Sequence, residues 1–211
     1  MMLKKYLSPM KAKLRGLIWI LKRYVKPPRL PVNDDGKTLL HLGCGPIDAR
    51  GFINVDLQPL PHVHHVSGAY PLDTFPSECA DLVYASHILE HFSWVNTLDV
   101  LKEWRRVLKP GGVLRLGVPD LPTLLSIYKD TGDIGQIYGP LMGGQSDPYN
   151  FHYAVFDEIS LKAMLITAGF RDVRGWNPDS AYRHSFRDTT SNIWKIGDKD
   201  YAISLNLEAV K

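Results

Sequence analysis

The spacing of apolar residues changes once along the chain, near residue 33. Before this point, apolar residues recur at every third or fourth position with Lys and Arg mostly between them, which predicts an amphipathic helix. Pro27 and Pro28 end this pattern and begin an extended linker. Beyond residue 33, short apolar runs bounded by glycine and proline turns alternate with helical patterns. We therefore expect a helix and linker over residues 1–33 and one α/β domain over residues 34–211.

The apolar runs of the domain predict seven strands and two long helices. We expect strands at Thr38–Leu42, Ile53–Leu57, Val63–Val66, Asp81–Ala85, Val113–Val118, Val173–Trp176 and Ala202–Ala209. One helix should follow the fourth strand, with Ser93 as a candidate N-cap and Trp94 on its inner face. The second should run from near Asp157 to Gly169. This order of elements predicts a mostly parallel sheet flanked by helices.

The connections at the start of this sheet are short. Ten residues, 43–52, separate the first two expected strands, and about six separate the second from the third. A parallel crossover normally takes a dozen residues or more and includes a helix. We therefore expect the first two crossover helices to be reduced to turns.

Charge is divided unevenly between the two parts of the chain. Residues 1–33 hold nine Lys or Arg and no Asp or Glu, whereas the other residues hold 16 basic and 22 acidic side chains. An acidic domain argues against nucleic acid as a partner. The basic helix within residues 1–26 can make peripheral contact with an anionic membrane surface. Alternatively, it packs on the domain or on a second subunit, as in a homodimer.

Composition and the length of the apolar segment predict in which cell compartment the protein lies. The chain is 45% hydrophobic and 22% charged, as globular proteins are. Its two cysteines, Cys44 and Cys79, form neither a disulfide framework nor a zinc spacing, which favours a reducing compartment. The apolar segment at residues 16–21 is too short to cross a bilayer, and no signal-peptide cleavage site follows it. We expect a cytoplasmic protein, at the inner face of a membrane if its N-terminal helix binds one.

A glycine turn and a carboxylate predict a nucleoside site. Gly43-Cys44-Gly45 follows the end of the first expected strand, and Asp56 closes the apolar run of the second. Glycines let a ligand approach the backbone closely, and a carboxylate at this place accepts hydrogen bonds from ribose hydroxyls. The third glycine of a dinucleotide fingerprint is replaced by Asp48, and Asp56 follows Gly43 by only 13 residues instead of about 20. NAD and FAD are therefore disfavoured.

Several segments together resemble a known family. They are Leu40–Pro46 (LHLGCGP), Asn54–Asp56 (NVD), Asp81–His91 (DLVYASHILEH), Leu108–Gly112 (LKPGG) and Val118–Asp120 (VPD). The chain from Lys37 to Lys211 is similar to class I S-adenosylmethionine-dependent methyltransferases, and in particular to small type 11 members associated with polysaccharide biosynthesis. The resemblance implies a Rossmann-like, seven-stranded, mostly parallel sheet with helices on both faces.

The resemblance also implies which residues bind the cofactor, S-adenosylmethionine. Gly43, Cys44 and Gly45 would lie under its methionine part, Asp56 would hold the ribose and Leu57 would contact the adenine. The expected cofactor-binding residues are Leu42, Gly43, Cys44, Gly45, Asp56, Leu57, Ala69, Tyr70 and Ser86. The turn after the third strand, residues 67–71, lacks the acidic residue that the family usually offers to the adenine amino group.

Methyl transfer to a hydroxyl requires alignment of the acceptor and benefits from a base, for which His is suited near neutral pH. His152 is the first candidate base, because it lies in a long insert, residues 121–156, that is free to form a lid over the substrate. His87 follows the fourth strand at the edge where open α/β sheets bind ligands. Asp120 follows the fifth strand and either orients a histidine or caps a helix.

We expect no metal site. His87-x-x-Glu90-His91 matches the short zinc pattern of inverted zinc peptidases, but it follows a buried strand and has no obvious third-ligand helix. His62, His64 and His65 flank a short strand and are expected at a solvated surface.

These observations predict O-methylation of a sugar or glycan acceptor. The glycan rests on the resemblance, with modest support from aromatic residues in the last third of the chain. The alternatives are methylation of another small molecule (a phenol, carboxylate or lipid) and a non-catalytic protein that binds S-adenosylmethionine and is tethered to a membrane or partner.

Overall fold

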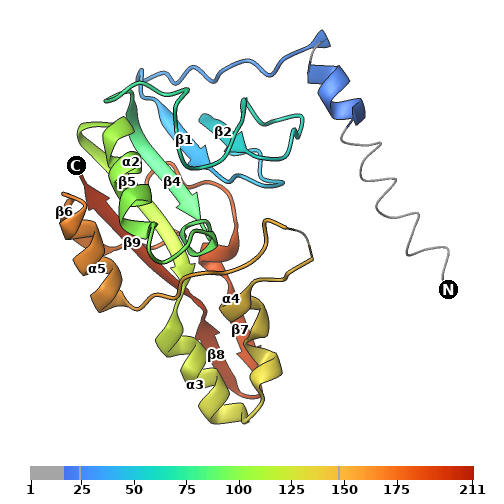
Figure 1. Ribbon diagram of the computed structural model, residues 1–211, viewed down its shortest axis with the longest axis vertical. Coiled ribbons are helices and arrows are strands. Elements are labelled where there is room, and N and C mark those ends of the chain that lie inside the picture. The colour runs from blue at the N-terminus through green and yellow to red at the C-terminus, as the bar shows by residue number, and fades with distance from the viewer. Residues whose placement is uncertain (1–16, 24, 147) are drawn as a thin grey trace.

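The computed structural model describes residues 17–23, 25–146 and 148–211 (Figure 1). Its centre is a seven-stranded sheet in the order β3-β2-β1-β4-β5-β9-β6. The strands are β1 (Leu39–Leu42), β2 (Phe52–Asp56), β3 (His65–Val66), β4 (Ala80–Ser86), β5 (Leu108–Pro119), β6 (Arg171–Gly175) and β9 (Ser204–Val210). The first five pair in parallel, and β9 is antiparallel to both of its neighbours. The predicted mostly parallel, Rossmann-like sheet is confirmed.

Two helices cover one face of this sheet, α2 (Thr97–Val107) and α5 (Glu158–Thr167). The buried Trp104 of α2 and Leu161 of α5 pack there against apolar side chains of the central strands. Asp157 starts α5 with a capping box, because its side chain accepts from the Ser160 N–H while the Ser160 hydroxyl accepts from the Asp157 N–H. The expected start of α5 is thereby confirmed.

The expected start of α2 is wrong. The helix begins at Thr97, and its N-cap is Asn96, three residues after the expected Ser93. The Asn96 N–H donates to the Ser93 carbonyl, so residues 93–96 form a separate turn before the helix. Trp94 therefore lies outside the helix and is 73% exposed, not on its inner face. The helical spacing of apolar residues continues through this turn, so the sequence pattern did not show where the helix begins.

The opposite face of the sheet is covered differently from what we expected. Irregular chain after Trp176, with only the 3₁₀ helix η3 (Thr189–Ser191), packs on Leu39, Phe52, Leu82 and Tyr84. The expectation of helices on both faces thus holds for one face, within the described residues. Aromatic rings supply the apolar area that a helix would otherwise supply.

The first two crossovers contain turns and no helix, as predicted (residues 43–51 and 57–64). Two histidines of the second crossover, His62 and His64, hydrogen-bond to backbone groups of other segments. His64 Nδ1 accepts from the Asn54 N–H at 2.9 Å, and His64 Nε2 donates to the Arg29 carbonyl at 3.1 Å. His62 Nε2 contacts the Gly45 carbonyl at 2.9 Å. The expectation of a solvated surface for this histidine cluster is wrong, since a short crossover needs side chains to satisfy its backbone groups.

The described part of the N-terminal helix, residues 17–23, docks on the same crossover by one side. Trp19 packs against Cys44, Leu60 and Val63. The Arg23 guanidinium donates to the carbonyls of Leu60, Val63 and His64. Residues 1–16, which hold most of the predicted helix, lie outside the described residues. No helix in the described segments is long and apolar enough to cross a membrane.

The insert after β5 forms its own small layer at the end of the sheet (Figure 1). It consists of α3 (Leu121–Thr131), the 3₁₀ helix η2 (Ile134–Gln136) and α4 (Tyr138–Met142), and it packs against a hairpin of β7 (Ile193–Ile196) and β8 (Lys199–Ala202). The elements predicted from the sequence pattern did not include this hairpin, and the expected strand at Ala202–Ala209 corresponds to β9 with only Ala202 from β8. The dipeptide Gly197-Asp198 between β7 and β8 is a two-residue turn signal that could have found it.

Candidate active site

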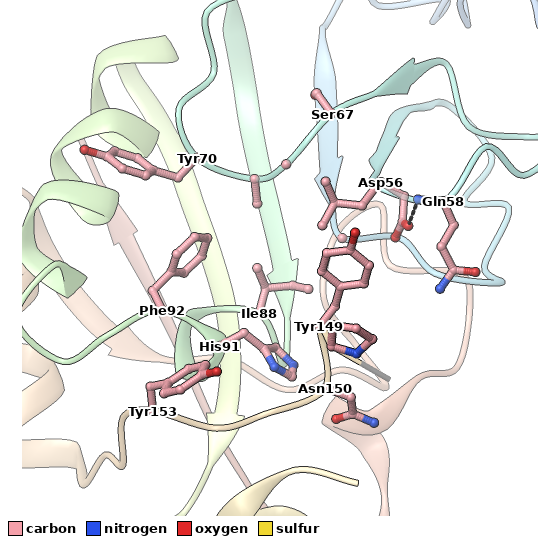
Figure 2. A pocket seen from close by; sticks show the side chains of 15 residues that line it. Asp56, Gln58, Ser67, Tyr70, Ile88, His91, Phe92, Tyr149, Asn150 and Tyr153 are labelled. Atoms are coloured by element: carbon pink, nitrogen blue, oxygen red, sulfur yellow. Dashed lines mark hydrogen bonds between the residues drawn. The ribbon is translucent and has the colours of Figure 1, made fainter. Parts of the chain in front are cut away.

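A cavity of about 560 Å³ opens at the carboxyl ends of β1, β2 and β4 (Figure 2). In open α/β sheets this edge is where ligands bind. The lining residues are Gly43, Asp56, Leu57, Gln58, Ser67, Gly68, Ala69, Tyr70, Ile88, His91, Phe92, Pro148, Tyr149, Asn150 and Tyr153. One wall thus comes from strand ends and turns, and another from residues 148–153 of the insert. The η1 segment (Leu89–His91) and its neighbours form the part between them.

The glycine turn after β1 forms the innermost part of the first wall. Gly43 has a φ of +61°, and a Cβ there would lie 1.9 Å from Ile88 Cδ1. Only glycine fits both this conformation and this contact. Cys44 points away from the cavity into the cluster under Trp19, and burial raises the pKa of its thiol to about 12. It is therefore a packing residue and not a nucleophile.

Asp56 ties the ends of β1 and β2 together. Its carboxylate accepts from the Gly45 N–H and from the Gln58 N–H, each at 2.7 Å. Figure 2 shows the hydrogen bond with Gln58. Each carboxylate oxygen has more than one acceptor site, so the side chain retains capacity for ligand hydroxyls. Asp56 lines the cavity, which places that capacity on its wall.

The turn after β3 completes this wall. Trp104 Nε1 of α2 donates to the Ala69 carbonyl at 2.8 Å and holds the turn against the helix. Tyr70 packs edge-on against Phe92, with ring centroids 6.1 Å apart. The Ser67 hydroxyl oxygen is buried and has no hydrogen-bond partner among the described residues.

Five of the nine predicted cofactor residues line the cavity, namely Gly43, Asp56, Leu57, Ala69 and Tyr70. The other four, Leu42, Cys44, Gly45 and Ser86, are not lining residues. Leu42 belongs to the hydrophobic core, and Gly45 acts through its N–H on Asp56. The sequence analysis missed Gln58, Ser67, Ile88, Phe92 and the insert residues at 148–150 and 153, which only the folding of distant segments brings to the cavity.

Beside the cavity, three histidines surround a buried carboxylate. Glu90 is fully buried, and His87 Nδ1 lies 3.1 Å from Glu90 Oε1. His87 Nε2 contacts the Ser204 hydroxyl at 2.7 Å, and its backbone has a φ of +53°. Both ring nitrogens of His87 are therefore engaged, so this predicted site residue fixes Glu90 and does not line the cavity.

His91 and His152 both carry a ring proton on Nδ1, because each Nδ1 faces a backbone carbonyl. His91 Nδ1 donates to the Phe151 carbonyl at 3.0 Å, and His152 Nδ1 donates to the Pro140 carbonyl at 2.9 Å. Their rings meet edge to face with centroids 4.8 Å apart. His91 lines the cavity, and His152, which is not a lining residue, contacts the His91 ring from the insert side. Burial lowers the pKa of His152, which favours its neutral form.

Asp120 is not a lining residue. Its carboxylate caps α3 by accepting from the Thr123 N–H at 3.2 Å and from the Thr123 hydroxyl at 2.5 Å. This is the helix-cap alternative that the sequence left open.

Comparison with known protein families indicates which reaction this chain supports. A family model described as a methyltransferase domain matches residues 53–116, from β2 to β5. The match covers 64 of the 211 residues and supports a methyltransferase enzyme. This match spans the carboxylate-bearing strand, the His87–His91 segment and α2, so it covers much of the cavity just described.

Solved structures agree with this methyltransferase in fold. An S-adenosylmethionine-dependent methyltransferase from Archaeoglobus fulgidus has a TM-score of 0.52 at 17% identity, covering 98% of this chain and 100% of that one. One from Methanosarcina mazei has a TM-score of 0.52 at 16% identity, covering 85% and 94%. One from Thermotoga maritima has a TM-score of 0.51 at 15% identity, covering 93% and 89%. No curated protein matches the sequence. Family and fold together support S-adenosylmethionine as the cofactor of the methyltransferase.

Proposed function

We propose that this methyltransferase transfers the methyl group of S-adenosylmethionine to an oxygen of a sugar or glycan. The observation that carries the proposal is the cavity with two unlike walls. Strand ends with Gly43 and Asp56 form one wall, and aromatic and amide side chains of the insert form the other (Figure 2). The first wall suits a nucleoside, and the second suits a polar ring.

On the first wall, Asp56 would accept the ribose hydroxyls and Gly43 would lie against the methionine part of the cofactor. Leu57 and Tyr70 would enclose the adenine. Backbone groups of the turn at residues 67–70 would bond the adenine edge in place of the acidic residue that the turn lacks. Leu42, Cys44, Gly45 and Ser86 would act indirectly, by holding the strand ends in place.

On the second wall, Tyr149, Asn150 and Tyr153 would bind the acceptor, since aromatic faces beside amide groups suit sugar rings. The insert would thereby act as the lid expected from its length. His152 would activate the acceptor together with His91 and Glu90. His87 would position Glu90, and Asp120 would hold the start of the insert through its cap on α3.

We also propose that the N-terminal helix makes peripheral contact with a membrane at its cytoplasmic face. Trp19 and Arg23 bind the domain, while Leu17, Ile18 and Leu21 are exposed beside basic residues. An apolar stripe with basic flanks suits anionic lipid. A second copy of the chain, as in a homodimer, is the competing partner for this stripe.

A methyl-transfer screen tests the acceptor class. Purified protein is incubated with S-adenosylmethionine and with sugar nucleotides, glycans, phenols, carboxylates or lipids, and release of S-adenosylhomocysteine is measured. We expect turnover with a sugar-containing acceptor. Turnover restricted to phenols, carboxylates or lipids would replace the glycan with that class. Binding without turnover on any acceptor would favour the non-catalytic alternative.

The cofactor position is tested by Asp56→Asn, because the amide keeps the shape of the side chain and loses its charge. We expect calorimetry to show S-adenosylmethionine affinity lowered by about 10- to 100-fold, the range for hydrogen bonds to a charged group. Asp99→Asn, on the exposed side of α2, serves as the matched control and should bind as the wild type does. An unchanged affinity in Asp56→Asn would remove the ribose assignment.

A further inference from the structure

Beside the cavity, one carboxylate and two imidazole side chains that could ligate a metal lie close together. Glu90, His91 and His152 each offer one ligand-type atom, and these atoms lie within 4.8 Å of one another. The first two follow β4 in η1, whereas His152 comes from the insert. The fold therefore assembles the group from segments about sixty residues apart, which the sequence pattern His87-x-x-Glu90-His91 did not indicate.

Hydrogen bonds determine which histidine atoms are available. In His91 and His152 alike, Nδ1 donates its proton to a backbone carbonyl, of Phe151 and Pro140 respectively. The neutral ring then has a bare lone pair on Nε2. Metal-binding histidines usually carry this kind of outer hydrogen bond, because it fixes the ring and its tautomer. His87 is excluded as a ligand, because both of its ring nitrogens are already in contact with Ser204 and Glu90.

The carboxylate of Glu90 is the third group. It is fully buried, and its contact with His87 Nδ1 involves only Oε1. Within the described part of the chain, no donor makes a hydrogen bond of good geometry to either carboxylate oxygen. Burial disfavours the charged carboxylate, His87 compensates it in part, and a cation beside its oxygens would stabilise it further.

We propose that Glu90, His91 and His152 bind one divalent metal ion. Two imidazole nitrogens and one carboxylate oxygen form the donor set of catalytic zinc sites with an open position, and Zn²⁺ is the ion to which we commit. Because His91 lines the cavity, the open coordination position would face it. This inference replaces the expectation of no metal that followed from sequence alone.

The role of the ion rests on the proposed function. An acceptor hydroxyl bound at the open position would lose its proton to solvent more readily, because a cation stabilises the resulting oxyanion. The new O–CH₃ bond then forms as the S–CH₃ bond of the sulfonium breaks. S-adenosylhomocysteine leaves, and one proton is released for each methyl group transferred.

Metal binding can be measured without any acceptor. The full chain, without an affinity tag, is stripped with a chelator, dialysed and titrated with ZnCl₂ by calorimetry. Co²⁺ is then added as a spectroscopic probe, because its visible bands report nitrogen and oxygen ligation. We expect one Zn²⁺ per chain and a rise in melting temperature with Zn²⁺, since a ligand that binds the folded state stabilises it.

Two ligand variants and one control locate the ion. Loss of an outer partner already costs about 10- to 100-fold in metal affinity, so Glu90→Gln and His152→Gln should each lose more than about 100-fold. His65→Gln changes a half-buried histidine that packs on Phe75, outside the cluster, and should bind Zn²⁺ as the wild type does. If Glu90→Gln does not fold, His152→Gln, whose side chain is partly exposed, carries the test.

Absence of stoichiometric Zn²⁺ binding, or equal binding in all variants, would overturn the metal site. If the wild type binds no ion, yet His152→Gln loses methyl transfer and keeps S-adenosylmethionine affinity, the cluster acts by proton transfer and only this inference fails. If Zn²⁺ binds as expected but no acceptor is methylated, the metal site stands and the proposed function fails.

Discussion

At Gly43, backbone conformation and available space independently exclude a side chain. The residue has a positive φ, and the Ile88 side chain fills the place where a Cβ would be. Gly45 has a similar φ of +52° but nothing within 4 Å of a would-be Cβ. The two glycines of one turn therefore separate the two causes: Gly45 is required by conformation alone, and Gly43 by conformation and contact together.

Alanine at each glycine tests this difference. We expect Gly45→Ala to lower the free energy of unfolding by about 1–2 kcal/mol, the penalty of a left-handed residue. Gly43→Ala should lower it by about 1–3 kcal/mol more, because it also overpacks against Ile88. Urea unfolding measures both, and adding Ile88→Ala to Gly43→Ala should recover part of the loss. Equal losses at the two positions would show that contact with Ile88 is unimportant.

At the scale of elements, the sheet has one face under helices and one under irregular chain. On the second face His41 of β1 is buried among the rings of Phe52, Tyr84 and Phe186. Burial lowers the pKa of His41 from 6.5 to about 4, because the charged ring would lose its hydration there. Packing without a helix thus depends on a histidine that remains neutral.

This face should weaken in acid. The folded state favours neutral His41, so its contribution is complete above pH 6.5 and is lost as the pH falls toward 4. A shift of this size corresponds to about 3 kcal/mol. We expect the unfolding free energy of the wild type to fall by about that much more than that of His41→Phe across this range. Urea unfolding at a series of pH values checks it, and parallel pH curves for the two proteins would contradict the assignment.

At the scale of the whole molecule, the described part of the N-terminal helix has one side docked on the domain and another side exposed. Trp19 and Arg23 bind it to the crossover between β2 and β3, so the alternative of packing on the domain holds for this side. Leu17, which is 57% exposed, and Leu21, at 59%, lie on another side. Docking and the proposed membrane contact would therefore use different faces of one helix and need not compete.

Substitutions on the two faces should have separate effects. Leu17→Ser with Leu21→Ser should reduce sedimentation with vesicles containing anionic phosphatidylglycerol, because apolar area on the lipid side is lost. The melting temperature should hardly change. Trp19→Ala should lower the melting temperature, since it empties the cluster with Leu60 and Val63. If the double variant keeps vesicle binding but loses self-association in ultracentrifugation, the exposed face is a dimer contact instead.

Local sequence determined the elements whose signals lie within one segment. The turn Gly43–Gly45, the carboxylate Asp56, the capping box at Asp157 and the shortened crossovers are all readable from neighbouring residues, because glycine conformation, capping and chain length are local constraints. The start of α2 was misjudged, because apolar spacing does not distinguish a turn from the helix that follows it.

Only the tertiary structure decided which distant groups meet. It brought Tyr149 and Tyr153 of the insert to the cavity and placed His152 beside Glu90 and His91. The reason is physical: strand order and long-range packing determine these distances, and periodicity along the chain contains no information about them. By itself the sequence determined a mostly parallel sheet and its glycine turn, and the folded chain decided the insert wall of the cavity and the histidine–carboxylate cluster.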